Sequence, residues 1–141
     1  MYKTLGVILI VLALVIGIVP QFTDCLSQGR TLKTVDGKMV PMKCHWTSIA
    51  EIGAAVPLAL VGVFHLTSKR RETKRSVALF GLTLGALAVL FPTVLIGVCS
   101  NPDMMCNMVE KPVLILAGTL AMAASLVGMV LPSTRMEVEL A

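Results

Sequence analysis

Four long apolar segments constrain this chain more than any other feature of its sequence. They cover residues 2–20, 48–67, 77–98 and 112–131, and polar or charged stretches separate them. About 20 apolar residues are enough for a helix to cross the hydrocarbon core of a bilayer. Because lipid offers the backbone no hydrogen-bond partner, we expect every span to be helical. The sequence therefore predicts an all-α membrane protein, a four-transmembrane-helix bundle that forms a single integral membrane domain over residues 1–141.

The overall composition agrees with a bilayer environment. Of the residues, 56% are hydrophobic and 14% are charged, whereas a soluble domain is about a quarter charged. One small core cannot bury so many apolar side chains, so lipid must cover them. The net charge of +4 comes with only 4% aromatic residues, too few for stacking on nucleic acid bases. We expect a lipid partner and no nucleic acid.

The basic residues predict the orientation, because cytoplasmic loops carry an excess of Lys and Arg. With the N-terminus inside, seven basic residues are cytoplasmic and five are outside. Both termini are then cytoplasmic and all four cysteines are outside, where disulfides persist. The expected location is the cell membrane, with several passes and extracytoplasmic cysteine loops. The short loop over residues 68–76 carries the topogenic charges Lys69, Arg70, Arg71, Lys74 and Arg75.

Each outer loop carries a pair of cysteines. In the first, over residues 21–47, Asp36-Gly37 stands between two short β-prone runs, which predicts a β-hairpin with a type I′ turn. Pairing outward from that turn brings Cys44 close to Cys25. The second loop, over residues 99–111, contains Cys99 and Cys106. We expect structural disulfides Cys25–Cys44 and Cys99–Cys106 that brace the outer loops, although four cysteines allow three pairings.

The same loops suggest two kinds of chemistry. Soft sulfur and imidazole ligands suit copper or zinc, and a metal or haem site could use Cys44, His45, Cys106, Met42 and Met105. Alternatively, four helices with two outer cysteine pairs have the layout of thiol oxidases that pass electrons to quinone. Those enzymes use Cys-x-x-Cys pairs with a lowered thiol pKa, and this chain has longer spacings. We therefore expect no catalytic residues and no required cofactor.

Three residues inside the apolar segments have other candidate roles. Glu51 lies about one turn inside the second span, and an intramembrane carboxylate is a candidate polar site because it is costly to bury. Gly81 and Gly85 form a Gly-x-x-x-Gly pattern that lets helices approach closely, either within the bundle or against a partner subunit.

The motif Met42-Lys43-Cys44-His45-Trp46-Thr47, with Gly97-Val98-Cys99 and Met105-Cys106 downstream, resembles a family of small four-helix prokaryotic membrane proteins. That family is catalogued as domain of unknown function 4418. The resemblance covers nearly the whole chain. It implies that the four cysteines and His45 matter, and it implies company with ABC-type export systems.

The leading hypothesis is a non-catalytic accessory subunit of a larger membrane transport assembly, with another integral membrane protein or a second copy as partner. Extracytoplasmic handling of copper, zinc or haem is the first alternative. Quinone-linked thiol–disulfide exchange is the second.

Overall fold

The computed structural model of the protein describes residues 2–130. Four helices in this range are long and apolar enough to cross a membrane, as the sequence predicts. They are α1 (Tyr2–Thr23), α2 (Lys43–Thr67), α3 (Arg71–Leu90) and α4 (Lys111–Val130), and π-helical segments extend the last two: η1 (Phe91–Leu95) continues α3, and η2 (Cys106–Glu110) precedes α4. The expected end of the fourth span at residue 131 and the side chain of Arg71 lie outside the described part.

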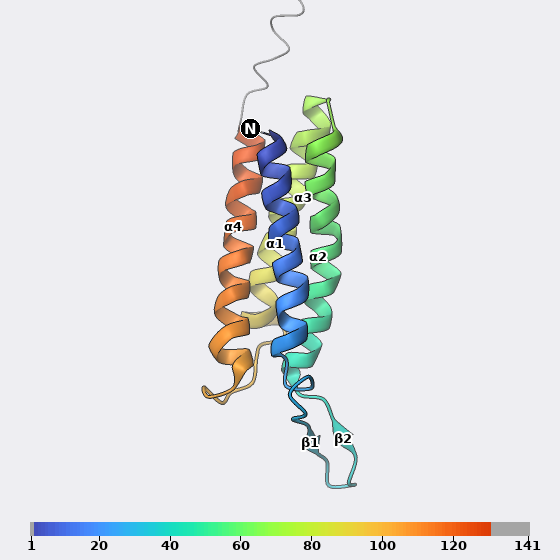
Figure 1. Ribbon diagram of the computed structural model, residues 1–141, viewed down its shortest axis with the longest axis vertical. Helices are drawn as coiled ribbons and strands as arrows, with labels where there is room; N and C mark the ends of the chain where they lie inside the picture. Colours follow the sequence, from blue (N-terminus) through green and yellow to red (C-terminus); the bar gives the residue numbers. More distant parts are fainter. Residues whose placement is uncertain (1, 131–141) are drawn as a thin grey trace, which may run out of the picture.

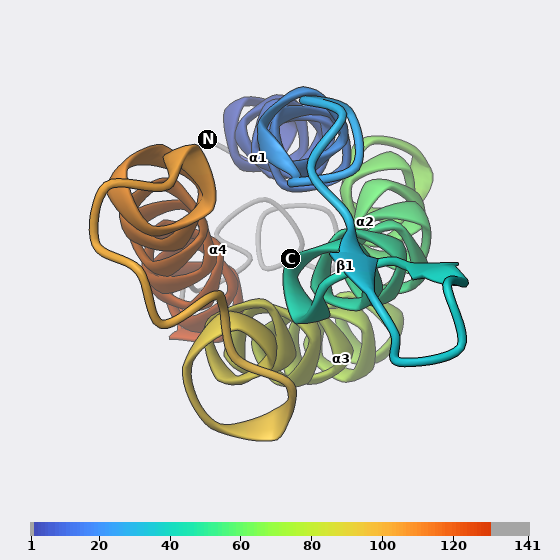
Figure 2. The same cartoon turned by 90° about the horizontal axis from the view of Figure 1, so that it is seen from below.

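The helices form an up-and-down bundle (Figure 1). Seen along its axis, the helices follow one another around a ring, so that α1 lies beside α2 and α4 (Figure 2). Residues from all four helices fill the interior, which is apolar over its middle: Leu9, Ile16, Leu58, Leu84 and Leu114. Their partly exposed neighbours face outward, where lipid would cover them. The chain is thus a multi-pass membrane protein with an apolar core between its four helices.

Two pairs of glycines set the closest helix approaches. A Cβ atom on Gly6 would lie 2.8 Å from the carbonyl oxygen of Gly62, and the converse distance is also 2.8 Å. Between α3 and α4, a Cβ on Gly118 would lie 2.9 Å from the carbonyl oxygen of Gly85. Such contacts with backbone oxygen leave no room for a side chain, so only glycine permits them. The chain therefore packs as two halves, residues 2–67 and residues 71–130, each held by its own glycine crossing.

The helices extend further than the apolar segments indicate. α2 begins at Lys43 and α3 begins at Arg71, about one turn before the apolar residues start. Neither short stretch contains proline or glycine, so nothing in it stops the helix. α1 continues past Pro20 to Thr23, because a proline in the last turn removes one hydrogen bond only. As a result, Cys44 and His45 lie in the first turn of α2 and not in the preceding loop.

The loop between α1 and α2 contains the expected β-hairpin. Strand β1 (Leu32–Lys33) pairs antiparallel with β2 (Met39–Val40). The turn differs from the predicted type I′, because only Gly37 has a positive φ, of 75°. Gly37 donates to the carbonyl of Thr34, and Thr34 donates to the carbonyl of Lys38. This is a three-residue loop with glycine in the left-handed position, which requires one left-handed residue and not two.

Candidate metal centre

Four cysteine sulfurs meet at the end of the bundle that carries residues 24–42 and 96–105, which we call the loop end. The Sγ atom of Cys44 lies 2.7 Å from that of Cys25 and 3.2 Å from that of Cys99. The Sγ atom of Cys25 lies 3.5 Å from those of Cys99 and Cys106. All four Sγ atoms lie within 4.8 Å of one another, and no disulfide bond joins them in this arrangement. The expected disulfides Cys25–Cys44 and Cys99–Cys106 stay a prediction.

Each half of the chain supplies two of these sulfurs. Cys25 follows the end of α1, and Cys44 lies in the first turn of α2. Cys99 lies in the loop after η1, and Cys106 is the first residue of η2. The hydroxyl of Thr47 donates to the carbonyl of Gly97 at 2.8 Å, which fastens the loop of Cys99 to α2. The site thus forms only when the two halves pack together.

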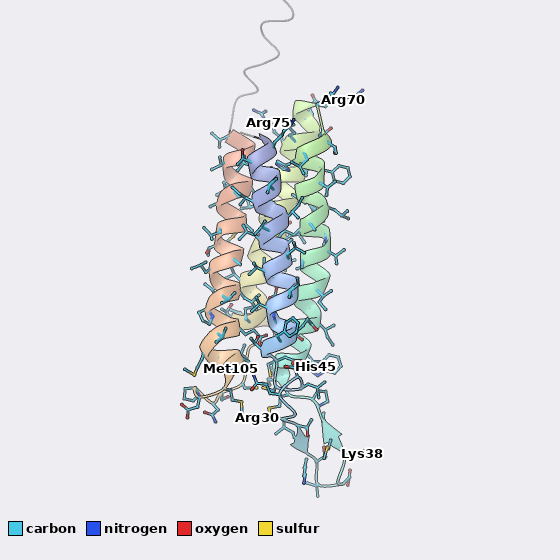
Figure 3. All side chains as sticks on the ribbon, viewed as in Figure 1. Arg30, Lys38, His45, Arg70, Arg75 and Met105 are labelled. Carbon is cyan, nitrogen blue, oxygen red and sulfur yellow. The ribbon has the colours of Figure 1, made fainter. Side chains whose placement is uncertain are left out.

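Two methionines flank the thiols. The sulfur of Met42 lies 3.8 Å from Cys99, and the sulfur of Met104 lies 3.9 Å from Cys25. Each methionine contacts a cysteine from the other half. Met105, which the sequence suggested as a ligand, has 48% of its surface exposed and lies at the loop end in Figure 3. In the second half of the chain, the methionine beside the thiols is therefore Met104 and not Met105.

His45 faces away from the cluster and toward a carboxylate. Its Nδ1 atom lies 2.9 Å from an oxygen of Asp24. The other oxygen of Asp24 accepts a hydrogen bond from the backbone N–H of Ser27 at 2.7 Å. Burial raises the pKa of Asp24, but the hydrogen bonds from His45 and Ser27 outweigh it, so the net pKa is lowered. His45 therefore holds the turn that follows α1, and the described geometry gives it no sulfur neighbour.

The thiols that lie outside the membrane spans differ in acidity. Burial raises the pKa of Cys25, and the neighbouring thiols raise this pKa further. Burial also raises the pKa of Cys99, but hydrogen bonds from Cys44 and Cys25 outweigh it, and the net pKa is lowered. Cys99 is also the one of the four that is only partly buried. It is therefore the thiol best placed to meet an incoming ligand.

Glu51 and Glu110 lie inside the bundle, further from the loops than the thiols. Both are completely buried, and none of their carboxylate oxygens has a hydrogen-bond partner. The sequence singled out Glu51. Glu110 falls within the predicted second loop, residues 99–111. Its position in η2, facing inward, could have been inferred only by extending the helix back from Pro112.

The other predicted residues have structural positions. Gly81 faces Ser125 and Val61, and Gly85 faces Gly118, so the chain's own helices fill this face. Arg70 and Arg75 lie at the end of the bundle opposite the thiols (Figure 3). We call this end, at residues 68–75, the basic end. Which end faces the cytoplasm stays a prediction.

The spacing of the four sulfurs matches a single metal ion. Zinc–sulfur bonds are about 2.3 Å long, so the sulfurs of a tetrahedral site lie about 3.8 Å apart. The observed sulfur–sulfur distances run from 2.7 Å to no more than 4.8 Å, a range that includes this value. The donor set suits thiophilic ions such as zinc and Cu(I). The residues present thus fit a tetrathiolate centre.

No curated protein and no solved structure matches the chain. Residues 5–131 match the family described as "Domain of unknown function (DUF4418)". The match includes every helix and all four cysteines. The chain therefore belongs to the DUF4418 family.

Proposed function

We propose that this membrane protein handles a thiophilic metal ion, with zinc as the best-fitting ion, at its loop end. The convergence of Cys25, Cys44, Cys99 and Cys106 from both halves of the chain supports the proposal. Three of the four cysteines are buried, and a buried cluster of thiols gains far more from a shared cation than exposed thiols would. With the basic end in the cytoplasm, the ion would bind on the extracytoplasmic side.

The test is metal analysis of protein purified anaerobically from its native membrane. We expect bound metal that is lost in Cys44→Ser and equally in Cys106→Ser, since each half contributes ligands. His65→Ala is a matched control, because His65 is buried near the basic end, far along α2. If all four cysteines resist alkylation until they are reduced, and no metal is bound, the proposal is wrong. The cysteines then form two structural disulfides.

The quinone-linked alternative has less support. It needs an apolar cavity beside the thiols. An apolar groove of about 280 Å³ lies between α2 and α3 and is lined by Pro57, Leu60, Phe64 and Phe80 among others. Its nearest residue on α2, Pro57, is 13 positions after Cys44, or about 20 Å along the helix. A quinone in that groove would be too far from the sulfurs to accept their electrons directly.

The accessory-subunit role is compatible with metal handling and is supported by a separate feature. Gly53 leaves open space on the outer face of α2, between the exposed side chains of Ile49, Ile52 and Val56. Small residues in such positions let a helix of another subunit approach. If the role holds, the protein co-purifies in fixed stoichiometry with another membrane protein in mild detergent. Recovery as a solitary monomer from the native membrane would count against it.

A further inference from the structure

Glu51 and Glu110 are the most costly side chains in the interior of this bundle. Each is 0% exposed, and all four of their oxygens lack a hydrogen-bond partner. Transfer of an unpartnered carboxyl group out of water is unfavourable, and more so if the group is charged. A pair of such groups implies that something satisfies them when the protein is at work.

The two carboxyl groups come from opposite halves of the chain. Glu51 lies on α2 and Glu110 ends η2, and the charge of Glu110 acts on Glu51 across the interior. They form no hydrogen bond to each other. Mutual hydrogen bonding, the simplest way for two carboxyl groups to satisfy each other, is not the arrangement found.

The charged groups nearest this pair do not neutralise it. Asp24, at the end of α1, adds a third negative charge that acts on Glu110. Lys43 and Lys111 stand close in sequence, but neither forms an ion pair with the glutamates. Toward the loop end, the buried residues of α3 and η1 include Ala88 and Pro92, and neither carries a charge. Asp24 is itself paired with His45, whereas no base among the described residues forms an ion pair with Glu51 or Glu110.

The carboxyl groups are in line with the thiols. Cys44 and Glu51 are seven residues apart on α2, which is two turns on the same face and about 10 Å along the axis. Cys106 and Glu110 are the first and last residues of η2, and both are buried. A cation that left the sulfurs toward the interior would therefore meet these carboxylates first.

We propose that Glu51 and Glu110 form a second divalent-cation site, which takes zinc beneath the thiol cluster. Zinc accepts both sulfur and carboxylate ligands, whereas Cu(I) prefers sulfur, so the pair of sites selects zinc. The inference rests on the proposed metal function, because the thiol cluster would supply the ion. It predicts two zinc ions per chain at saturation. Beyond the pair the interior is apolar from Leu58 to Ala121, so the second ion is held and not passed further in this conformation.

The test uses the full-length protein in lipid nanodiscs, loaded with zinc and freed of excess ion before elemental analysis. We expect two zinc ions in the wild type and one in Glu51→Gln and in Glu110→Gln. Glu72→Gln is the matched control, because Glu72 is exposed in the first turn of α3, and it should keep two. Cobalt loaded in place of zinc reports the thiols separately, through its sulfur-to-cobalt absorption, and this absorption should persist in both glutamine variants.

The outcomes separate the two proposals. Suppose that the wild type and both glutamine variants each bind one zinc ion and show the cobalt–sulfur absorption. This result overturns the carboxylate site and means that Glu51 and Glu110 bind protons and not zinc. Zinc without cobalt–sulfur absorption, lost in Glu51→Gln, supports the carboxylate site and rejects the thiol centre. If a glutamine variant misfolds, the number of zinc ions in the wild type decides by itself. Two zinc ions, with a cobalt–sulfur absorption that accounts for one metal ion per chain, support the inference. One zinc ion per chain rejects it.

Discussion

The two halves of the molecule, residues 2–67 and 71–130, supply matching parts to the candidate site but are built differently. Each provides two cysteines and one buried glutamate. In the first half, the sulfurs of Cys25 and Cys44 lie 2.7 Å apart, at the two ends of a long loop with a β-hairpin. In the second, six residues separate Cys99 from Cys106, and each of these approaches a sulfur of the first half. Two loops of very different length thus place equivalent ligands at the site. We infer that the positions of the helix ends, more than the loops, determine the geometry of the site.

The glycine crossings also differ between the halves, and they give the largest expected effect. The Gly6–Gly62 crossing lies near the basic end, whereas Gly118 lies closer to the loop end. Gly6→Ala and Gly118→Ala should each lower the free energy of unfolding by about 1–3 kcal/mol, because the new methyl group meets backbone oxygen. Only Gly118→Ala should also weaken metal binding. Reversible unfolding in detergent and a chelator competition measure the two effects.

Gly53→Ala is the control for this prediction. A Cβ at Gly53 meets nothing within 4 Å, so the variant should be as stable as the wild type or gain up to about 1 kcal/mol from helix propensity. Equal loss of metal affinity in Gly6→Ala and Gly118→Ala would show that the halves do not act separately on the site.

The sequence indicated a good part of this arrangement. The lengths of the apolar segments predict four helices, and Asp36-Gly37 predicts the hairpin, because both follow from local backbone chemistry. Alternating helix direction also predicts that all four cysteines share one end. The sequence could not show that their sulfurs converge, since that depends on the rotation of each helix. Glu110 was missed because a π-helical segment turns an apparently polar loop toward the interior.

A second prediction concerns Asp24, which has no equivalent in the second half. Its pKa is lowered from the ordinary value of 3.8, so the unfolded chain binds the proton more readily. Its contribution to stability is present above pH 3.8 and is lost as the pH falls through the lower pKa of the folded state. Asp24→Asn should lose about 1.5–3 kcal/mol at neutral pH, as expected for hydrogen bonds to a charged group.

Unfolding of metal-free protein at a series of pH values checks this effect. The wild type should lose stability on acidification, and Asp24→Asn should follow a flatter curve. Asp36→Asn, in the exposed turn of the hairpin, should behave as the wild type does. Parallel curves for all three proteins would contradict the role given to the His45–Asp24 pair.

The smallest effect is expected for the β-hairpin itself. Its residues are exposed, and Val35 is fully so. Replacing residues 31–41 with a short Gly/Ser linker should change metal affinity less than twofold, because the second half positions its cysteines with six intervening residues. A chain with the hairpin sequence scrambled serves as the control in the same competition assay. A tenfold loss in the linker variant alone would show that the hairpin does contribute to the site.

The π-helical segments η1 and η2 flank the second loop on both sides, and they decide where the chain can lose a residue without losing the site. A π-turn contains one residue more than an α-turn. Deleting one residue from η2, such as Asn107, would therefore restore α-helical winding and leave Cys106 on nearly the same face of the helix. Deleting one residue from the regular helix α4, such as Val113, would instead rotate Cys106 by about 100° relative to the rest of α4. In this protein a metal centre can therefore be lost through a change of phase, with no ligand mutated.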